Sequence, residues 1–136
     1  MTTHLVWLRN DLRITDNKAL HAACSDPKAR VLAVFIATPE QWRQHEMAPR
    51  QAALIHASLQ AVQQALAQKG IALHCHACAD FAASIDWLAD YCEREQVDAL
   101  FYNRQYELNE RRRDEQLEQR LSDRVTCHGF DDSLLL

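Results

Sequence analysis

The chain alternates short, nearly continuous apolar runs with longer segments of helical periodicity. The clearest apolar run, VLAVFIA at Val31–Ala37, is typical of a strand that is buried on both faces of a sheet. Between such runs, apolar residues recur at helical steps, as Ile55, Leu59 and Leu66 do within the longest segment. The pattern predicts strands at His4–Arg9, Val31–Ala37, Ile71–His76, Val97–Tyr102 and Val125–Phe130.

Four helices are predicted in the segments between these strands. Pro49 and Gly70 flank the longest helix, in agreement with the preference for Pro at a helix start and Gly after its end. Asp80 is placed to cap the next helix. Every crossover is long enough to join parallel strands, and such connections are almost always right-handed. The helices are expected at Asn17–Cys24, Arg50–Lys69, about Phe81–Cys92 and Asn109–Leu121.

This order predicts an α/β fold with a five-stranded parallel, Rossmann-like sheet and helices on both faces. The 136 residues, 48% of them apolar, are sufficient for one domain with one hydrophobic core, spanning residues 1–136. A net charge of −4 provides no basic field for a phosphate backbone, so we expect no nucleic-acid binding by this chain alone. Its two glycines exclude both the G-x-G-x-x-G fingerprint and a P-loop followed by Lys.

The cysteines and the apolar runs bear on the compartment. The five cysteines are odd in number and irregularly spaced, and MTTHLVWLRNDLR is not a signal peptide. Reduced thiols in a cytoplasmic protein are the simplest interpretation. No apolar stretch approaches the length of a membrane span, so we expect no membrane partner.

Ligands of open α/β sheets bind beyond the carboxyl ends of the strands. Polar segments follow three of the predicted strands, at residues 9–17, 38–47 and 103–110. These segments are therefore the places where we expect a ligand site.

Several of the same segments carry a family resemblance. W-x-R-x-D-L-R-x-x-D-N runs from Trp7 to Asn17, and TPEQW, HEMAPRQ, FYNRQYELNERRRD and GFDDSLL follow in order. Together they resemble the DNA photolyase and cryptochrome family, especially bacterial class I cyclobutane pyrimidine dimer photolyases, from His4 to Leu135. The resemblance implies an amino-terminal, antenna-binding α/β domain. The helical domain that holds FAD and binds UV-damaged DNA is then absent from this chain, and it is expected to cover the apolar end at Ser133–Leu136.

The resemblance also implies site residues. The positions that hold a folate antenna, 5,10-methenyltetrahydrofolate, correspond to Asn109, Glu110 and His45. A carboxylate can accept the amide N–H and the exocyclic amine of a pterin in parallel. The full-length protein is implied to repair pyrimidine dimers by light-driven electron transfer from reduced FAD. This chain alone would hold no catalytic residue and no metal, and would be inactive.

The residues also allow structural interpretations. Asn109 and Glu110 suit a helix start, as an N-cap and an acid that complements the helix dipole. Arg9, Asp11, Arg13 and Asp16 form either a phosphate or DNA site or, as we favour, a structural ion-pair cluster in which Asp16 or Asn17 caps the next helix.

Three further groups are interpreted as structural. The spacing of His74, Cys75, His76 and Cys78 matches no standard zinc pattern. In a strand, the two histidines would also point to one face and Cys75 to the other. Trp7, Trp42 and Trp87 could suggest an electron-transfer chain, but Trp7 lies in a predicted core strand and Trp87 on a predicted helix, so packing explains them better. Arg111–Arg113 is interpreted as a solvated helix face, with ion pairs such as Glu107–Arg111.

Two other functions remain open at this point. A signalling cryptochrome has the same domain, and the downstream sequence would distinguish it. A stand-alone nucleotide-binding α/β module would bind ATP or a similar ligand, which isothermal titration would detect.

Overall fold

A computed structural model describes residues 2–9, 12–38, 49–105 and 108–131 of the chain, with side chains in α3 from Ala53 onward. All five strands are parallel, in the order β3-β2-β1-β4-β5. The predicted α/β fold is confirmed, with each element within about two residues of its expected place. The strands are β1 Thr3–Leu8, β2 Arg30–Ala37, β3 Ala72–Ala77, β4 Ala99–Asn103 and β5 Thr126–Phe130. The helices are α1 Lys18–Ala23, α3 Pro49–Gln68, α4 Phe81–Arg94 and α5 Leu108–Leu121.

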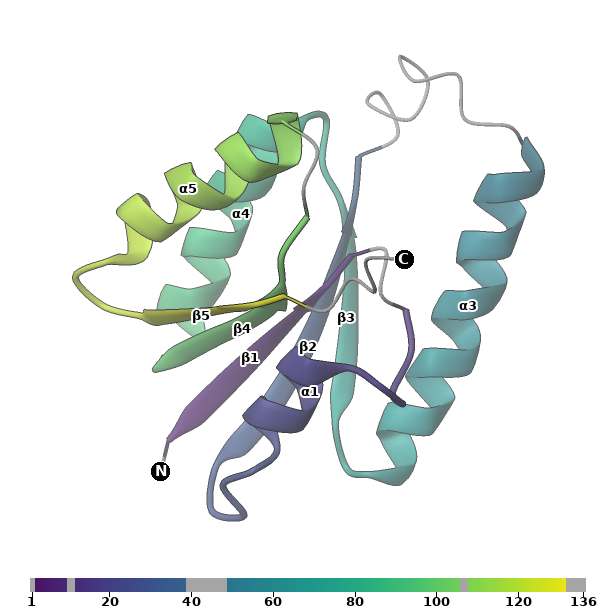
Figure 1. Cartoon of the computed structure of the whole chain (residues 1–136), viewed down its shortest axis with the longest axis horizontal. Helices are drawn as coiled ribbons and strands as arrows, with labels where there is room; N and C mark the ends of the chain where they lie inside the picture. The colour runs from purple at the N-terminus through teal and green to yellow at the C-terminus, as the bar shows by residue number, and fades with distance from the viewer. Residues whose placement is uncertain (1, 10–11, 39–48, 106–107, 132–136) are drawn as a thin grey trace.

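Helices cover both faces of the sheet (Figure 1), with α1 and α3 on one face and α4 and α5 on the other. Alternate residues of each strand therefore enter different cores. In β1, Leu5 and Trp7 pack toward α4 and α5, whereas Val6 and Leu8 pack toward α1 and α3. This explains why β1 is continuously apolar from Leu5 to Leu8 rather than alternating.

Three strands begin later than the apolar pattern predicts, and the reason is the same at each. Ile71, Val97 and Val125 lie before their strands and are buried. Each donates its backbone N–H to a carbonyl in the last turn of the preceding helix, at 2.8–2.9 Å. Gly70 (φ +77°) and Gln96 (φ +53°) have the left-handed conformation that ends such helices. The apolar residue therefore closes a helix instead of opening a strand.

The strand order places a topological switch between β1 and β4. The chain leaves β1 toward β2 on one side and reaches β4 on the other, so the carboxyl ends of β1 and β4 flank a crevice. Trp7 of β1 and Tyr102 of β4 are paired in register immediately below that edge. A ligand site of this fold is expected there.

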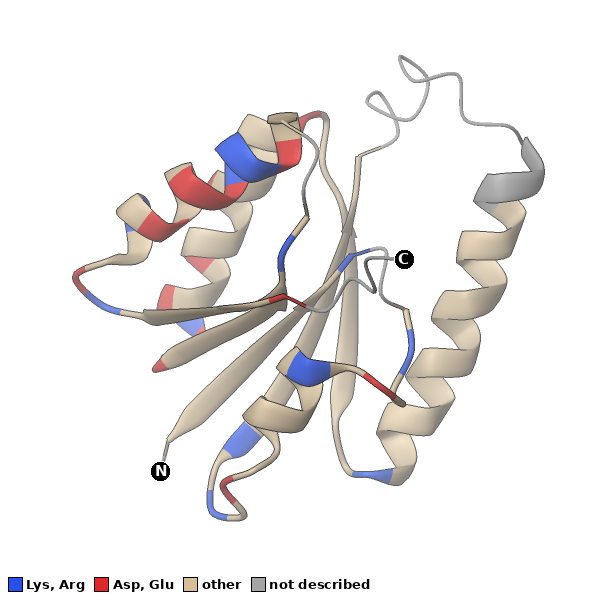
Figure 2. Ribbon diagram, in the orientation of Figure 1, with Lys and Arg blue, Asp and Glu red and all other residues tan. Residues whose placement is uncertain are grey.

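Charged side chains are unevenly distributed over the helices (Figure 2). They gather on α4 and α5, while the described length of α3 carries none. None of the described helices is both long enough and apolar enough to span a membrane.

Candidate functional site at the carboxyl edge of the sheet

An asparagine pair joins the two sides of the switch point. Asn103, the last residue of β4, accepts a hydrogen bond from the Ala19 N–H at 3.1 Å and donates one to the Asn17 side-chain oxygen at 2.8 Å. The same Asn17 oxygen accepts from the Leu20 N–H at 3.1 Å. Asn17 is therefore the N-cap of α1, as predicted, and Asn103 fixes that cap against the sheet.

Replacing Asn103 should loosen α1. We expect Asn103→Ala to lower the free energy of unfolding by about 2–3 kcal/mol, because the buried Ala19 N–H and the Asn17 amide lose partners. Urea unfolding measures the change. Asn103→Asp retains the acceptor for Ala19 but buries a carboxylate against the Asn17 oxygen, so it should be no more stable than Asn103→Ala. Equal stability of Asn103→Ala and the unsubstituted chain would contradict this role.

Arg9 follows β1 and is buried, with 6% of its surface exposed. Its Nη1 donates to Asp114 Oδ1 of α5 at 2.5 Å, and its Nη2 donates to the backbone carbonyl of Asn103. Arg9 is therefore paired with a carboxylate outside the β1–α1 loop, 105 residues away in the sequence. Arg13 instead donates to the Asp16 carbonyl at 3.1 and 3.3 Å, where Asp16 has a φ of +52°. Asp11 lies outside the described residues.

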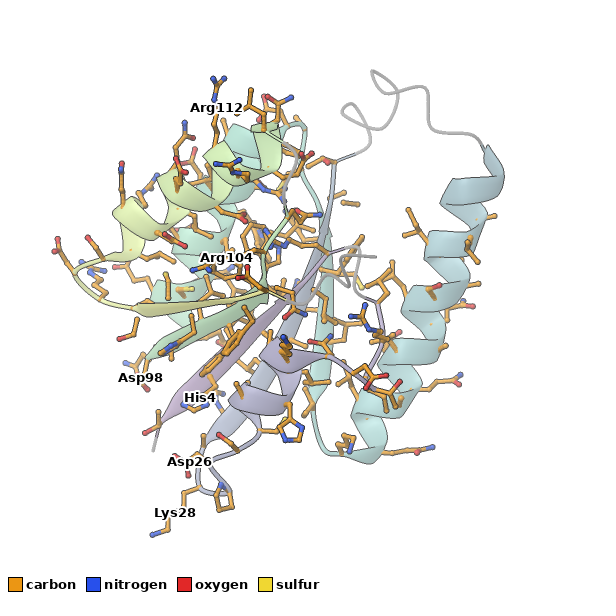
Figure 3. The ribbon with its side chains drawn as sticks, in the orientation of Figure 1. His4, Asp26, Lys28, Asp98, Arg104 and Arg112 are labelled. Carbon is orange, nitrogen blue, oxygen red and sulfur yellow. The ribbon has the colours of Figure 1, made fainter. Side chains whose placement is uncertain are left out.

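Arg113 of α5 contradicts the interpretation of Arg111–Arg113 as a solvated face. Arg111 and Arg112 are exposed, and Figure 3 shows Arg112 projecting away from the sheet, but Arg113 is 7% exposed. Its guanidinium carbon lies 4.7 Å from the centre of the Trp7 ring and 4.2 Å from that of Phe81. The planar cation packs on aromatic faces, which is why burial is tolerated. Glu107, the expected partner of Arg111, lies outside the described residues.

Arg9, Arg113 and Asp114 form a buried charge cluster, and their charges influence one another. Burial lowers the pKa of Arg113 to about 10, and repulsion from Arg9 adds to the effect. Arg113 is thus cationic at neutral pH. Burial also raises the pKa of Asp114, and the neighbouring Arg9 opposes this change. Burial of the Arg9–Asp114 pair costs desolvation free energy, so removal of either partner alone is expected to destabilise the fold.

The predicted folate residues lie one turn before this cluster. Glu110, half-buried, is the acid in the first turn of α5, as expected from the helix dipole. Because α5 begins at Leu108, the exposed Asn109 lies within that turn, so its interpretation as the N-cap is wrong by position. Among the described residues, neither side chain makes a hydrogen bond or an ion pair. His45 lies outside the described residues, so the structure brings together only Asn109 and Glu110.

The histidine and tryptophan candidates of β3 and α4 form an aromatic stack. The His76 and Trp87 rings are parallel, with centres 4.4 Å apart, and Trp87 also stacks on Tyr91. His74 contacts the same Trp87, while Cys75 points to the opposite face, as predicted. Within the described residues, no group of three or more His, Cys, Asp or Glu side chains is placed to hold a metal. Trp7 is fully buried, as a packing role requires, and Trp42 lies outside the described residues.

A groove of about 1130 Å³ opens on the α1 and α3 face, away from α5, with Arg13, Lys18 and Lys69 in its lining. Two of these cations already have partners, since Arg13 binds the Asp16 carbonyl and Lys18 Nζ donates to the Asp131 carbonyl at 2.6 Å. The arrangement disfavours the phosphate or DNA interpretation of this loop.

The sequence patterns missed Asn103, Arg113 and Asp114. The sequence does contain a signal for Arg113 and Asp114. They begin a buried stripe that continues at helical steps through Leu117 and Leu121. Charged residues at the buried end of an apolar stripe indicate a buried ion pair.

The chain is therefore an α/β domain with a doubly wound parallel sheet, a fold whose ligands bind at the switch point of the sheet. Within that class, residues 4–136 match the family model described as DNA photolyase. The chain belongs to the DNA photolyase family.

Individual relatives agree with this assignment. The chain is 58% identical to a deoxyribodipyrimidine photo-lyase of Salmonella typhimurium over all 136 residues, which is 28% of that enzyme's length. An archaeal photolyase structure from Sulfolobus tokodaii superposes on 98% of the chain, and the chain on 30% of it, with a TM-score of 0.81 and 26% identity. A Synechocystis cryptochrome covers 96% of the chain, with 27% of its own length matched, a TM-score of 0.83 and 22% identity, which shows a common fold alone.

Proposed function

We propose that this chain is the antenna-binding, amino-terminal α/β domain of a deoxyribodipyrimidine photolyase. The observation that carries the proposal is the 58% identity to the Salmonella enzyme along the whole chain. The longer protein would bind FAD and UV-damaged DNA in a helical domain that packs on this one. It would repair pyrimidine dimers in the cytoplasm by light-driven electron transfer from reduced FAD. This chain alone would be inactive.

We further propose that the antenna is 5,10-methenyltetrahydrofolate, held at the start of α5. Glu110 would accept two hydrogen bonds in parallel from the pterin, and Asn109 can both donate and accept beside it. The donor set fits, because both side chains lie in one helical turn and have no partner among the described residues. His45 would be the third contact in this domain, and the helical domain would complete the site. When bound, the folate absorbs light and passes its excitation to the flavin.

The division of labour between the two domains can be tested directly. The purified 136-residue chain and the full-length photolyase are each mixed with UV-irradiated DNA and exposed to blue light. We expect repair by the full-length protein only, because the proposal assigns the flavin and DNA sites to the helical domain. Repair by the chain alone would contradict the proposal.

A signalling cryptochrome is the second candidate, since the Synechocystis protein has this fold. The same assay separates the two, because a full-length protein that binds FAD without repairing dimers would favour the receptor. The third candidate, a stand-alone nucleotide-binding module, predicts saturable heat on titration of the chain with ATP. The family match along the chain disfavours it.

A further inference from the structure

The first half of α5 is attached to the sheet by charged residues. The buried residues of this helix are Arg113 and Asp114 in its first half and Leu117 and Leu121 in its second. Apolar packing therefore fixes the end of the helix that is remote from Glu110. The orientation of the end that carries Glu110 depends on the contacts of Arg113 and Asp114.

Arg113 connects α5 to three other elements. Its guanidinium lies against Trp7 of β1 and against Phe81, the first residue of α4. Its Nη2 also donates to Gln105 Oε1, in the β4–α5 connection, at 3.2 Å. A planar cation between aromatic rings is fixed in orientation as well as in place. Rotation of the first turn of α5 would break all three contacts.

Asp114 adds a second attachment one residue further along the helix. Through Arg9 it is tied to the end of β1 and to the backbone carbonyl of Asn103 at the end of β4. The Arg9 guanidinium in turn lies 4.6 Å from the centre of the Trp7 ring and 5.0 Å from that of Tyr102. Both attachments therefore converge on the switch point of the sheet.

Glu110 is the neighbour of both residues on the helix surface, three positions before Arg113 and four before Asp114. Their charges act on Glu110 in opposite directions, since Arg113 attracts its carboxylate and Asp114 repels it. The electrostatic coupling of Glu110 to both side chains supports this closeness. Movement of Arg113 would change the direction in which the Glu110 carboxylate points.

We propose that Arg113 is a positioning residue of the antenna site: packed on Trp7 and Phe81, it orients the first turn of α5 so that Glu110 faces the pterin. This inference rests on the proposed folate site and adds to it a residue that touches no ligand. Arg113 is buried beneath Glu110 and acts through it.

The test uses the full-length photolyase with Arg113→Met, Arg113→Lys and, as a matched control on the exposed face of the same helix, Arg112→Met. Folate affinity, the folate absorption maximum, FAD content and Tm are measured for each. We expect Arg113→Met to weaken folate about tenfold, the loss of one aligned charge-assisted hydrogen bond, with FAD content unchanged. The absorption maximum of the folate that still binds should shift. Arg113→Lys should give a smaller loss, because the charge beside Glu110 remains, and Arg112→Met should give none.

Comparison with Glu110→Ala separates the two proposals. If Glu110→Ala loses folate while Arg113→Met and Arg113→Lys bind it with unchanged affinity and spectrum, the positioning role is overturned and the folate site stands. If Glu110→Ala also retains folate, the folate site itself fails. Should Arg113→Met not fold, Arg113→Lys and Gln105→Ala decide, since each removes the hydrogen bond of Arg113 to Gln105. Unchanged folate binding in both would overturn the inference.

Discussion

Asp114→Ala is expected to lower the free energy of unfolding by about 3–5 kcal/mol, a large part of the stability of a domain of this size. The side chains of Arg9 and Asp114 are 5% and 9% exposed, so the substitution removes a buried carboxylate that Arg9 Nη1 contacts at 2.5 Å. Asp114 also offsets the repulsion between Arg9 and Arg113, both of which contact Trp7. Its loss would therefore leave two cations facing each other in a low-dielectric core.

Urea unfolding of the 136-residue chain measures this change, and two other variants control it. Asp86→Ala breaks the Arg120–Asp86 pair, whose side chains are 53% and 69% exposed, and should cost no more than about 1 kcal/mol. Arg9→Met combined with Asp114→Leu removes both charges and should recover much of the loss. A cost for Asp114→Ala no greater than that for Asp86→Ala would show that the buried pair does not hold α5.

The order of elements could be predicted from the sequence because its cause is local. Runs such as Val31–Ala37 are apolar throughout because helices cover both faces of the sheet, and α3 shows its helical period within a single segment. The starts of three strands were misplaced because Ile71, Val97 and Val125 are apolar for a different reason, the closure of the preceding helix. Apolar character alone does not distinguish these two uses.

The site was less predictable because its contacts are long-range. The family resemblance led to Asn109 and Glu110, which the structure places in one turn at the start of α5. It could not reveal that Arg9 pairs with Asp114, because that pair depends on the strand order that brings β1 beside β4. The prediction that Arg113 is solvated is wrong because two exposed arginines precede it in the sequence. Only the direction of its side chain, toward the sheet, distinguishes it from Arg111 and Arg112.

Glu110→Ala is expected to abolish folate binding in the full-length photolyase. Loss of two parallel charge-assisted hydrogen bonds corresponds to a decrease in affinity on the order of a hundredfold or more. Because Glu110 is half-buried at the start of α5 and makes no hydrogen bond or ion pair among the described residues, we expect Tm and FAD content to stay close to those of the unsubstituted protein. Glu110→Gln keeps the shape and one acceptor oxygen, and should retain weak binding. Asn109→Ala should weaken folate binding less than Glu110→Ala does, because the Asn109 side chain is a neutral amide and its hydrogen bonds to folate are not charge-assisted.

The measurement that tests the proposed function most directly is the absorption spectrum of the purified full-length protein, unsubstituted and with Glu110→Ala, from which the molar ratio of folate to FAD is obtained. Assignment of the antenna site to the start of α5 predicts equimolar folate and FAD in the unsubstituted protein. In Glu110→Ala it predicts loss of the near-ultraviolet folate band with FAD unchanged. A full folate band in Glu110→Ala, or a second FAD and no folate in the unsubstituted protein, would contradict it; the Sulfolobus tokodaii photolyase structure contains two FAD molecules.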